Sequence, residues 1–172
     1  PSLGKDSIEA GRRSFLIGAG LVVLFMIGYY RVAGVVAITA LVVNVLLILA
    51  AIAGFRGVLT LPGIAGIVLT LGMAVDANVL INERIREELR QGRTAHAALD
   101  AGYAKALPAI LDSNITTLLA GLILFQFGSG PIKGFALTLC IGIITTIYTG
   151  VFCSRALHDV IVGGRANPRL SI

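Results

Sequence analysis

Residues 69–81 read LTLGMAVDANVLI, an apolar run that contains a single carboxylate, Asp76. The seven residues that follow read NERIREE and are almost all polar, so the apolar run ends at residue 81. Counting back to Val58 gives 24 residues without Lys or Arg, and a helix of that length crosses a bilayer core of about 30 Å. An ionised carboxylate at that depth costs about 2.5 to 3.5 kcal/mol, so Asp76 is expected to face protein or water and to handle an ion.

The composition of the whole chain is strongly apolar. Hydrophobic residues make up 56% of the 172 residues and charged residues only 13%, and the mean hydropathy is +0.92. These values exclude a single soluble domain. Apolar periodicity and the gaps between charged residues predict an all-α membrane protein, a bundle of five transmembrane helices at 14–30, 32–55, 58–81, 109–127 and 134–154.

The fourteen basic residues fall unevenly on the two sides of this predicted bundle. Nine lie on one side and five on the other, the five being Lys5, Arg12, Arg13, Arg56 and Lys133. The positive-inside rule therefore places residues 1–13 in the periplasm and the tail 155–172 in the cytoplasm. The basic residues that give the chain its net charge of +5 are thus interpreted as determinants of membrane topology and not as a nucleic-acid-binding surface. An outside amino end without a signal peptide leads us to expect a longer protein with an upstream span.

The segment 82–108 is predicted to be a cytoplasmic helical loop. The third helix is expected to continue past the membrane surface, with Arg84 and Glu88 as an exposed i, i+4 pair. Thr94 is then expected to cap a second, amphipathic helix whose apolar face lies along the cytoplasmic surface. Pro108 would open the fourth span.

Several polar or small residues lie in or near the spans around Asp76. Gly72 precedes it by four residues and is expected to leave a notch for a neighbouring helix or a water molecule. Asn78 is expected either to support Asp76 without carrying the proton itself or to form a hydrogen bond to another helix. Asp112 lies at a similar depth and is interpreted either as a second ion-handling acid or as a cap or first-turn acid of the fourth span. Further candidates for a proton path follow it at Asn114, Thr116 and Thr117.

Three other residues in the spans are interpreted as structural. Asn44 lies in the middle of the second span, where it is expected to form a hydrogen bond between helices. Cys140 and Cys153 both fall in the fifth span and are expected to pack, not to form a disulfide or a metal site. No catalytic, cofactor-binding or metal-binding residues are predicted.

Four stretches of the sequence together resemble a known family. They are 61–68 (LPGIAGIV), 72–81 with 83–88 (GMAVDANVLI and ERIREE), 114–117 (NITT) and 127–136 (FGSGPIKGFA). In this order, and over nearly the whole chain, they resemble the SecD family, membrane subunits of the bacterial Sec protein-export machinery. The resemblance implies membership of the resistance-nodulation-division superfamily, with these helices as the second to sixth spans of a longer protein.

The resemblance also implies a function. A protein of this family would lie in the bacterial inner membrane, pair with SecF, dock on the SecYEG channel and use the proton gradient to pull preproteins outward. Asp76 matches the proton-carrying aspartate of the family, whereas Asp112 and Asn114 match a motif with a less defined part in proton movement. The coupling ion would be the proton, with no other cofactor and no enzymatic activity.

Two alternatives remain open from the sequence. One is half of a proton-driven small-molecule efflux transporter of the same superfamily, which would continue into a second half. The other is an intramembrane aspartyl protease, which would need Asp76 and Asp112 to act as a coupled acid pair. Neither aspartate lies in the Tyr-Asp or Gly-x-Gly-Asp setting of such proteases.

Overall fold

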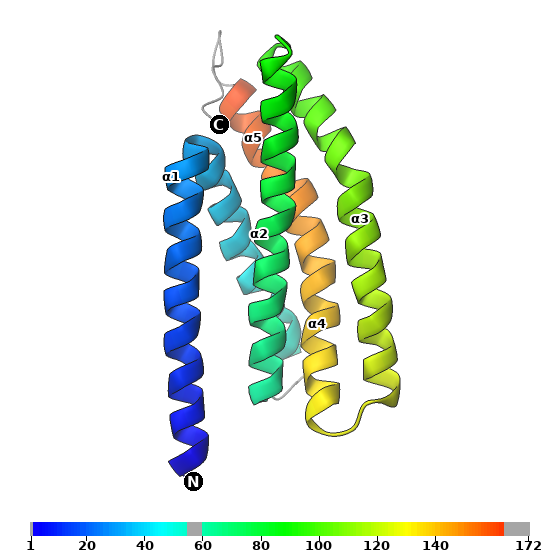
Figure 1. Cartoon of the computed structure of the whole chain (residues 1–172). Helices are drawn as coiled ribbons and strands as arrows, with labels where there is room; N and C mark the ends of the chain where they lie inside the picture. Colours follow the sequence, from blue (N-terminus) through cyan, green and yellow to red (C-terminus); the bar gives the residue numbers. More distant parts are fainter. Residues whose placement is uncertain (1, 55–59, 164–172) are drawn as a thin grey trace.

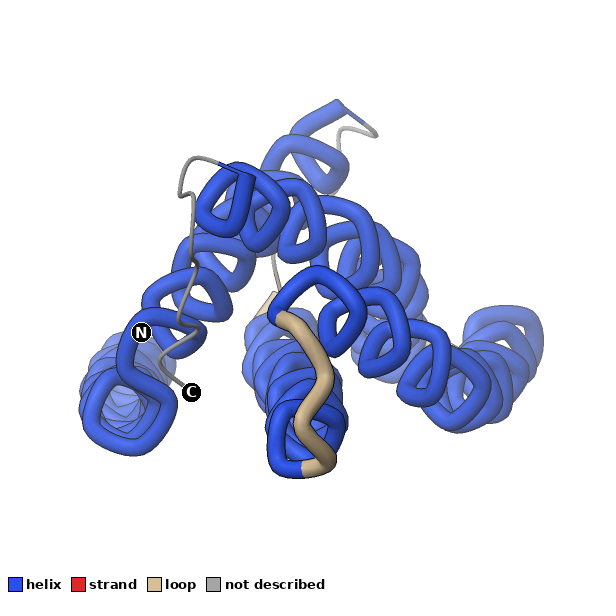
Figure 2. Tube along the Cα trace, turned by 90° about the horizontal axis from the view of Figure 1, so that it is seen from above, coloured by secondary structure: helices blue, strands red, loops and turns tan. Residues whose placement is uncertain are grey.

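The computed structural model describes residues 2–54 and 60–163, and within these ranges all regular structure is helical. The elements are α1 (Ser2–Gly54), α2 (Leu61–Arg90), α3 (Ala95–Phe127), α4 (Pro131–Ile147), the π-helix η1 (Tyr148–Cys153) and α5 (Ser154–Gly163). Figure 1 shows α2, α3 and α4 side by side, with α1 beside and behind them. Seen along the bundle in Figure 2, α2 lies at the lower rim of the view, between the first arm of α1 and α3. It packs against α1, α3 and α4.

Helix α1 consists of two arms joined by a sharp reversal. Arg31 has φ 48° and ψ −113°, which is outside the helical region, and the chain folds back at the top of α1 in Figure 1. Gly34 permits the close approach of the arms, because a Cβ atom there would lie 2.0 Å from the carbonyl oxygen of Met26. The reversal lies at the predicted boundary between the first two spans.

Helix α2 begins and ends with local signals that the sequence contains. Thr60 caps it by accepting a hydrogen bond of 3.2 Å from the amide of Gly63. The helix continues to Arg90, as predicted, and Gly92 adopts φ +83° in the turn that follows. Thr94 then caps α3 by accepting from the amide of Ala97 at 3.4 Å, which confirms the predicted cap.

Helix α3 corrects the prediction of a separate helix along the membrane surface over 95–107. It is one helix with Pro108 inside it, so Pro108 does not begin a helix. The apolar face of 95–107 packs on α2, where Ala98, Leu99 and Ala106 share a buried cluster with Ile85. A proline is tolerated within such a helix because neighbouring groups satisfy the freed backbone carbonyl. The segment 82–108 is therefore a tight α2–α3 hairpin.

The chain from Pro131 to Gly163 is helical throughout, with a π-helical stretch between α4 and α5. Glycine lets α4 approach α2, since a Cβ atom on Gly142 would lie 2.5 Å from Thr70. Helix α5 occupies part of the segment predicted as a tail, and its His158 and Val162 are buried. The rest of that tail, 164–172, lies outside the described residues. So do residues 55–59, which include the last residue of the second predicted span, Arg56 and the first two residues of the third span.

Within the described residues, four helices are long and apolar enough to cross a membrane: Glu9–Gly54, Leu61–Arg90, Ala95–Phe127 and Pro131–Gly163. The count differs from the predicted five because α1 is one element that holds both arms. We call the end of the bundle that holds the α1 reversal, the α2–α3 turn and α5 the hairpin end (Figure 1). The amino end of α1 and the α3–α4 turn lie at the opposite end.

Candidate functional site

Asp76 lies on the exposed side of α2. Among the described residues it has no hydrogen bond and no ion pair with another side chain. An acidic side chain on the surface of a membrane-crossing helix is unfavourable in contact with lipid. The face of α2 that carries Asp76 is therefore suited to contact with another protein segment or with water.

Gly72 lies one turn before Asp76 and is also exposed. A Cβ atom placed on it would meet nothing within 4 Å, so no neighbouring helix of this chain uses its small size. It lines an apolar groove of about 650 Å³ between the first arm of α1 and the first half of α2. The space beside Gly72 is open to a segment from outside this part of the chain.

Asn78 does not lie beside Asp76. It is 4% exposed, and its Nδ2 donates to the carbonyl oxygen of Ala74 on its own helix at 2.9 Å. Asn114 behaves in the same way on α3, donating to the carbonyl oxygen of Ile110 at 2.7 Å. The two asparagines therefore point into the bundle, whereas Asp76 lies on its surface.

Asp112 is exposed in the middle of α3, seventeen residues after the first residue of that helix. The interpretation of Asp112 as a helix cap or first-turn acid is therefore wrong. Thr116 and Thr117 donate to the backbone carbonyls of Asp112 and Ser113, at 2.8 and 2.9 Å. In the part of the chain that the structure describes, no hydrogen bond joins Asp112 or either threonine to Asp76.

The predicted interhelical hydrogen bond of Asn44 is confirmed. Its Nδ2 donates to Oγ1 of Thr146 on α4 at 3.0 Å, and both side chains are buried. The sequence analysis did not single out Thr146, because one threonine in an apolar run carries no distinctive signal. Cys140 and Cys153 are both free thiols.

Charged residues of the α2–α3 hairpin pair differently from the prediction. Arg84 pairs with Glu87 at 2.9 Å instead of with Glu88. Glu88 is fully buried, where it contacts Lys105 at 2.5 Å and Arg93 at 2.9 Å. The hydrogen bond from Lys105 holds the pKa of Glu88 below its usual value, with Arg93 acting in the same direction against burial. Glu88 on α2 is thus paired with Lys105 on α3 and with Arg93 in the turn between the two helices.

A buried polar cluster at the hairpin end was missed by the sequence analysis. The hydroxyl of Tyr103 lies 2.8 Å from Oγ of Ser154 and 3.0 Å from Nδ1 of His158. Burial lowers the pKa of His158 and raises that of Tyr103. The available signal was the i, i+4 spacing of Ser154 and His158, but their partner Tyr103 is more than fifty residues away in the sequence.

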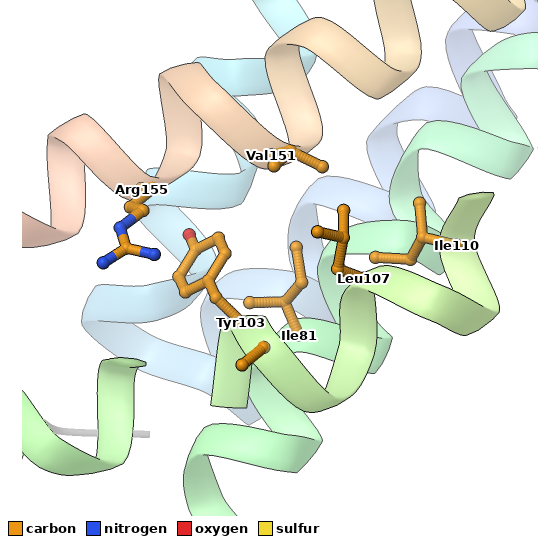
Figure 3. A pocket seen from close by; sticks show the side chains of 7 residues that line it. Ile81, Tyr103, Leu107, Ile110, Val151 and Arg155 are labelled. Carbon is orange, nitrogen blue, oxygen red and sulfur yellow. The ribbon is translucent and has the colours of Figure 1, made fainter. Parts of the chain in front are cut away.

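A small pocket of about 220 Å³ lies beside this cluster, between α2, α3 and the π-helix. Figure 3 shows Ile81, Leu107, Ile110 and Val151 as its apolar wall, with Tyr103 and Arg155 at one side. Arg155 is paired with Asp100 at 2.6 Å. None of the residues singled out from the sequence lines this pocket, so it is separate from the Asp76 surface.

Comparison with known proteins gives a consistent result. Residues 1–162 match the family model described as "Protein export membrane protein SecD/SecF, C-terminal". The chain is 55% identical over all 172 residues to the protein translocase subunits SecD of Calditerrivibrio nitroreducens and Desulfurispirillum indicum, and covers 33% of each. The crystal structure of SecDF from Thermus thermophilus, a translocon-associated membrane protein, superimposes with a TM-score of 0.93 at 43% identity.

The SecDF match covers all of this chain and 24% of that protein. The chain thus spans about a third of the length of the curated relatives that it matches. Both the resemblance seen in the sequence motifs and the all-helical membrane architecture agree with these matches. The chain therefore belongs to the SecD/SecF carboxyl-terminal family of protein-export membrane proteins.

Proposed function

We propose that the longer protein to which this chain corresponds is a subunit of the bacterial protein-export machinery that is driven by the proton-motive force. It acts with SecF and the SecYEG channel in the inner membrane to move preproteins outward. The relatives named SecD and the translocon-associated SecDF support the assignment to protein translocation. The observation that supports proton coupling is the exposed carboxylate of Asp76 on a membrane-crossing helix.

The topology that we propose has five crossings. The helical stretch Glu9–Gly54 has 46 residues and would be about 69 Å long if straight, more than twice the bilayer core. Its reversal at Arg31 divides it into two crossings of ordinary length. With nine of the fourteen basic residues on one side, the hairpin end is cytoplasmic and the amino end of the chain is periplasmic.

Asp76 is the proton carrier in this proposal, and its partner lies outside this sequence. No Lys or Arg falls within the five predicted spans, so an ionised Asp76 has no cation at its own depth here. A carrier must visit both protonation states, and a nearby cation favours the ionised one. We assign this cation to SecF, which approaches the exposed α2 face across the open space at Gly72.

The proposal is tested with the full-length protein in membrane vesicles that carry a defined proton gradient. Asp76→Asn keeps the shape of the side chain and removes its titration. The variant should insert and assemble normally, yet export should fall to the level measured without a gradient. Asp112→Asn, at the other exposed membrane carboxylate, is the matched comparison. Gradient-stimulated export that persists undiminished in Asp76→Asn would exclude Asp76 as the carrier.

A further inference from the structure

Asp76 shares its face of α2 with a second acidic residue, Glu83, which lies nearer the hairpin end. Glu83 follows Asp76 by seven residues, so it lies on almost the same side of the helix, about 10 Å further along the axis. Leu80 lies between them, one turn from each. Asp76 is exposed, and Leu80 and Glu83 are both half-buried. Two acidic groups thus share one face of one helix, about two turns apart, with Leu80 between them.

A polar groove begins at Leu80. It has a volume of about 560 Å³ and is lined by Leu80, Glu83, Arg84, Glu87, Arg90 and Gln91. Its wall therefore starts four residues after Asp76 and reaches the end of α2 at Arg90. Four of the six lining residues carry a charge, so the groove is wetted by water. Water in the groove approaches Asp76 to within about one helical turn, or about 6 Å of helix axis.

Glu83 is held at the start of the groove by contacts with two helices. Its Oε1 accepts a hydrogen bond of 2.9 Å from the hydroxyl of Tyr30 on α1 and one of 2.8 Å from Arg86. The guanidinium of Arg86 lies 4.6 Å from the ring centroid of Tyr29 and 5.2 Å from that of Tyr30. The Glu83 side chain nevertheless stays 43% exposed. It is therefore both fixed in place and accessible to water.

We propose that this groove is the path by which protons pass between Asp76 and the hairpin end, with Glu83 as the first relay group. This inference rests on the proposed role of Asp76 as the proton carrier. The carboxyl group of Asp76 gives its proton to water beside Leu80, and the carboxylate of Glu83 accepts a proton from that water. Glu83 then releases the proton to water in the groove, so both carboxylates are regenerated and no other reactant is needed.

The decisive variant is Glu83→Gln in the full-length protein reconstituted with its partners in lipid vesicles. The amide oxygen of Gln can still accept hydrogen bonds from Tyr30 and Arg86, but the side chain no longer carries a proton. The measurement is the infrared carboxyl band of Asp76, followed after a pH jump on the side of the hairpin end. We expect the rate of the Asp76 protonation change to fall at least about tenfold.

Three matched variants separate a relay from a structural role. Tyr30→Phe removes the hydrogen bond but keeps the Glu83 carboxylate, so it should lose much less of the rate than Glu83→Gln. Asp100→Asn removes an exposed carboxylate at the hairpin end that does not line the groove, and it should keep a rate close to that of the unmodified protein. Glu83→Asp retains a titratable group and should recover most of the rate lost in Glu83→Gln. An unchanged rate in Glu83→Gln, or an equal loss in Tyr30→Phe, would overturn the relay.

The same experiment distinguishes failure of the relay from failure of the proposed function. If the Asp76 band of the unmodified protein never responds to an imposed gradient, the carrier role of Asp76 is wrong. If that band responds and Glu83→Gln responds equally fast, only the path through the groove is wrong.

Discussion

Asn44 and Thr146 are 102 positions apart in the sequence, and a buried hydrogen bond of 3.0 Å joins them across the second arm of α1 and helix α4. Their side chains are 0% and 1% exposed. Oδ1 of Asn44 has no partner among the described residues. This bond is therefore the one side-chain hydrogen bond of Asn44 among the described residues, and it is made by Nδ2.

Thr146→Val should destabilise the bundle by about 1 to 2 kcal/mol, because it leaves the amide of Asn44 buried without an acceptor. Adding Asn44→Leu should recover part of that loss, since both polar groups are then removed. The measurement is a double-mutant cycle on the unfolding of the full-length protein in detergent. Thr39→Val is the control, because Thr39 is exposed and donates to Val35 of its own helix. Strictly additive effects of the two core substitutions would contradict the coupling.

Two glycines offer a matched pair for helix packing. A Cβ atom on Gly102 would lie 2.9 Å from the backbone Cα of Ile85, whereas one on Gly72 would meet nothing within 4 Å. Gly102→Ala should therefore separate α2 from α3 and destabilise the hairpin by about 1 to 3 kcal/mol. Gly72→Ala should not destabilise the bundle, and it should stabilise α2 by up to about 1 kcal/mol because Ala is the better helix former. Thermal unfolding of both variants provides the comparison, and equal effects would refute the packing argument.

The sequence predicted the helices and the residues whose environment depends on local patterns. Apolar periodicity correctly predicted an all-helical membrane protein, and the polar residues Thr94 and Asn44 were given their correct structural roles. These predictions succeeded because a cap is set by its own helix, and because a lone amide in an apolar span has few alternatives to a hydrogen bond between helices.

The parts that the sequence did not predict depend on contacts between distant segments. The apolar face of 95–107 suits a membrane surface as well as it suits a neighbouring helix, and only Ile85 opposite Gly102 distinguishes the two. Proline is common at the start of a helix, but Pro108 lies inside α3. The roles of Tyr103 and His158 likewise follow from a contact between α3 and α5.

The buried His158 gives the hairpin end a pH dependence. Burial lowers its pKa from the ordinary value of 6.5, so the unfolded chain binds a proton on this imidazole more readily than the folded protein does. The stability of the folded protein with respect to His158 is therefore greatest above pH 6.5. Below pH 6.5 it decreases, by up to about 1.4 kcal/mol per pH unit. Tyr103 and Ser154 contact the ring, and Asp159, whose charge favours protonation, opposes the burial effect.

We expect the melting temperature of the full-length protein to decrease as the pH is lowered from 7.5 to 5.5. His158→Gln should make this decrease smaller. His96→Gln is the control, because the only other histidine in the sequence is exposed. The same pH dependence in His158→Gln as in the unmodified protein would show that another group is responsible.

The proposed topology is tested by single cysteines at exposed positions, in a background that lacks Cys140 and Cys153. Glu9 lies near the amino end of α1 and Ser129 in the α3–α4 turn, and His96 is the second residue of α3. The first two segments lie at one end of the bundle, and the start of α3 lies at the hairpin end. If α1 crosses the membrane twice, an impermeant thiol reagent should label Glu9→Cys and Ser129→Cys from one side and His96→Cys from the other. If α1 crosses only once, Glu9→Cys should instead be labelled from the same side as His96→Cys. The position of the Glu9 label relative to the other two therefore decides between five crossings and four.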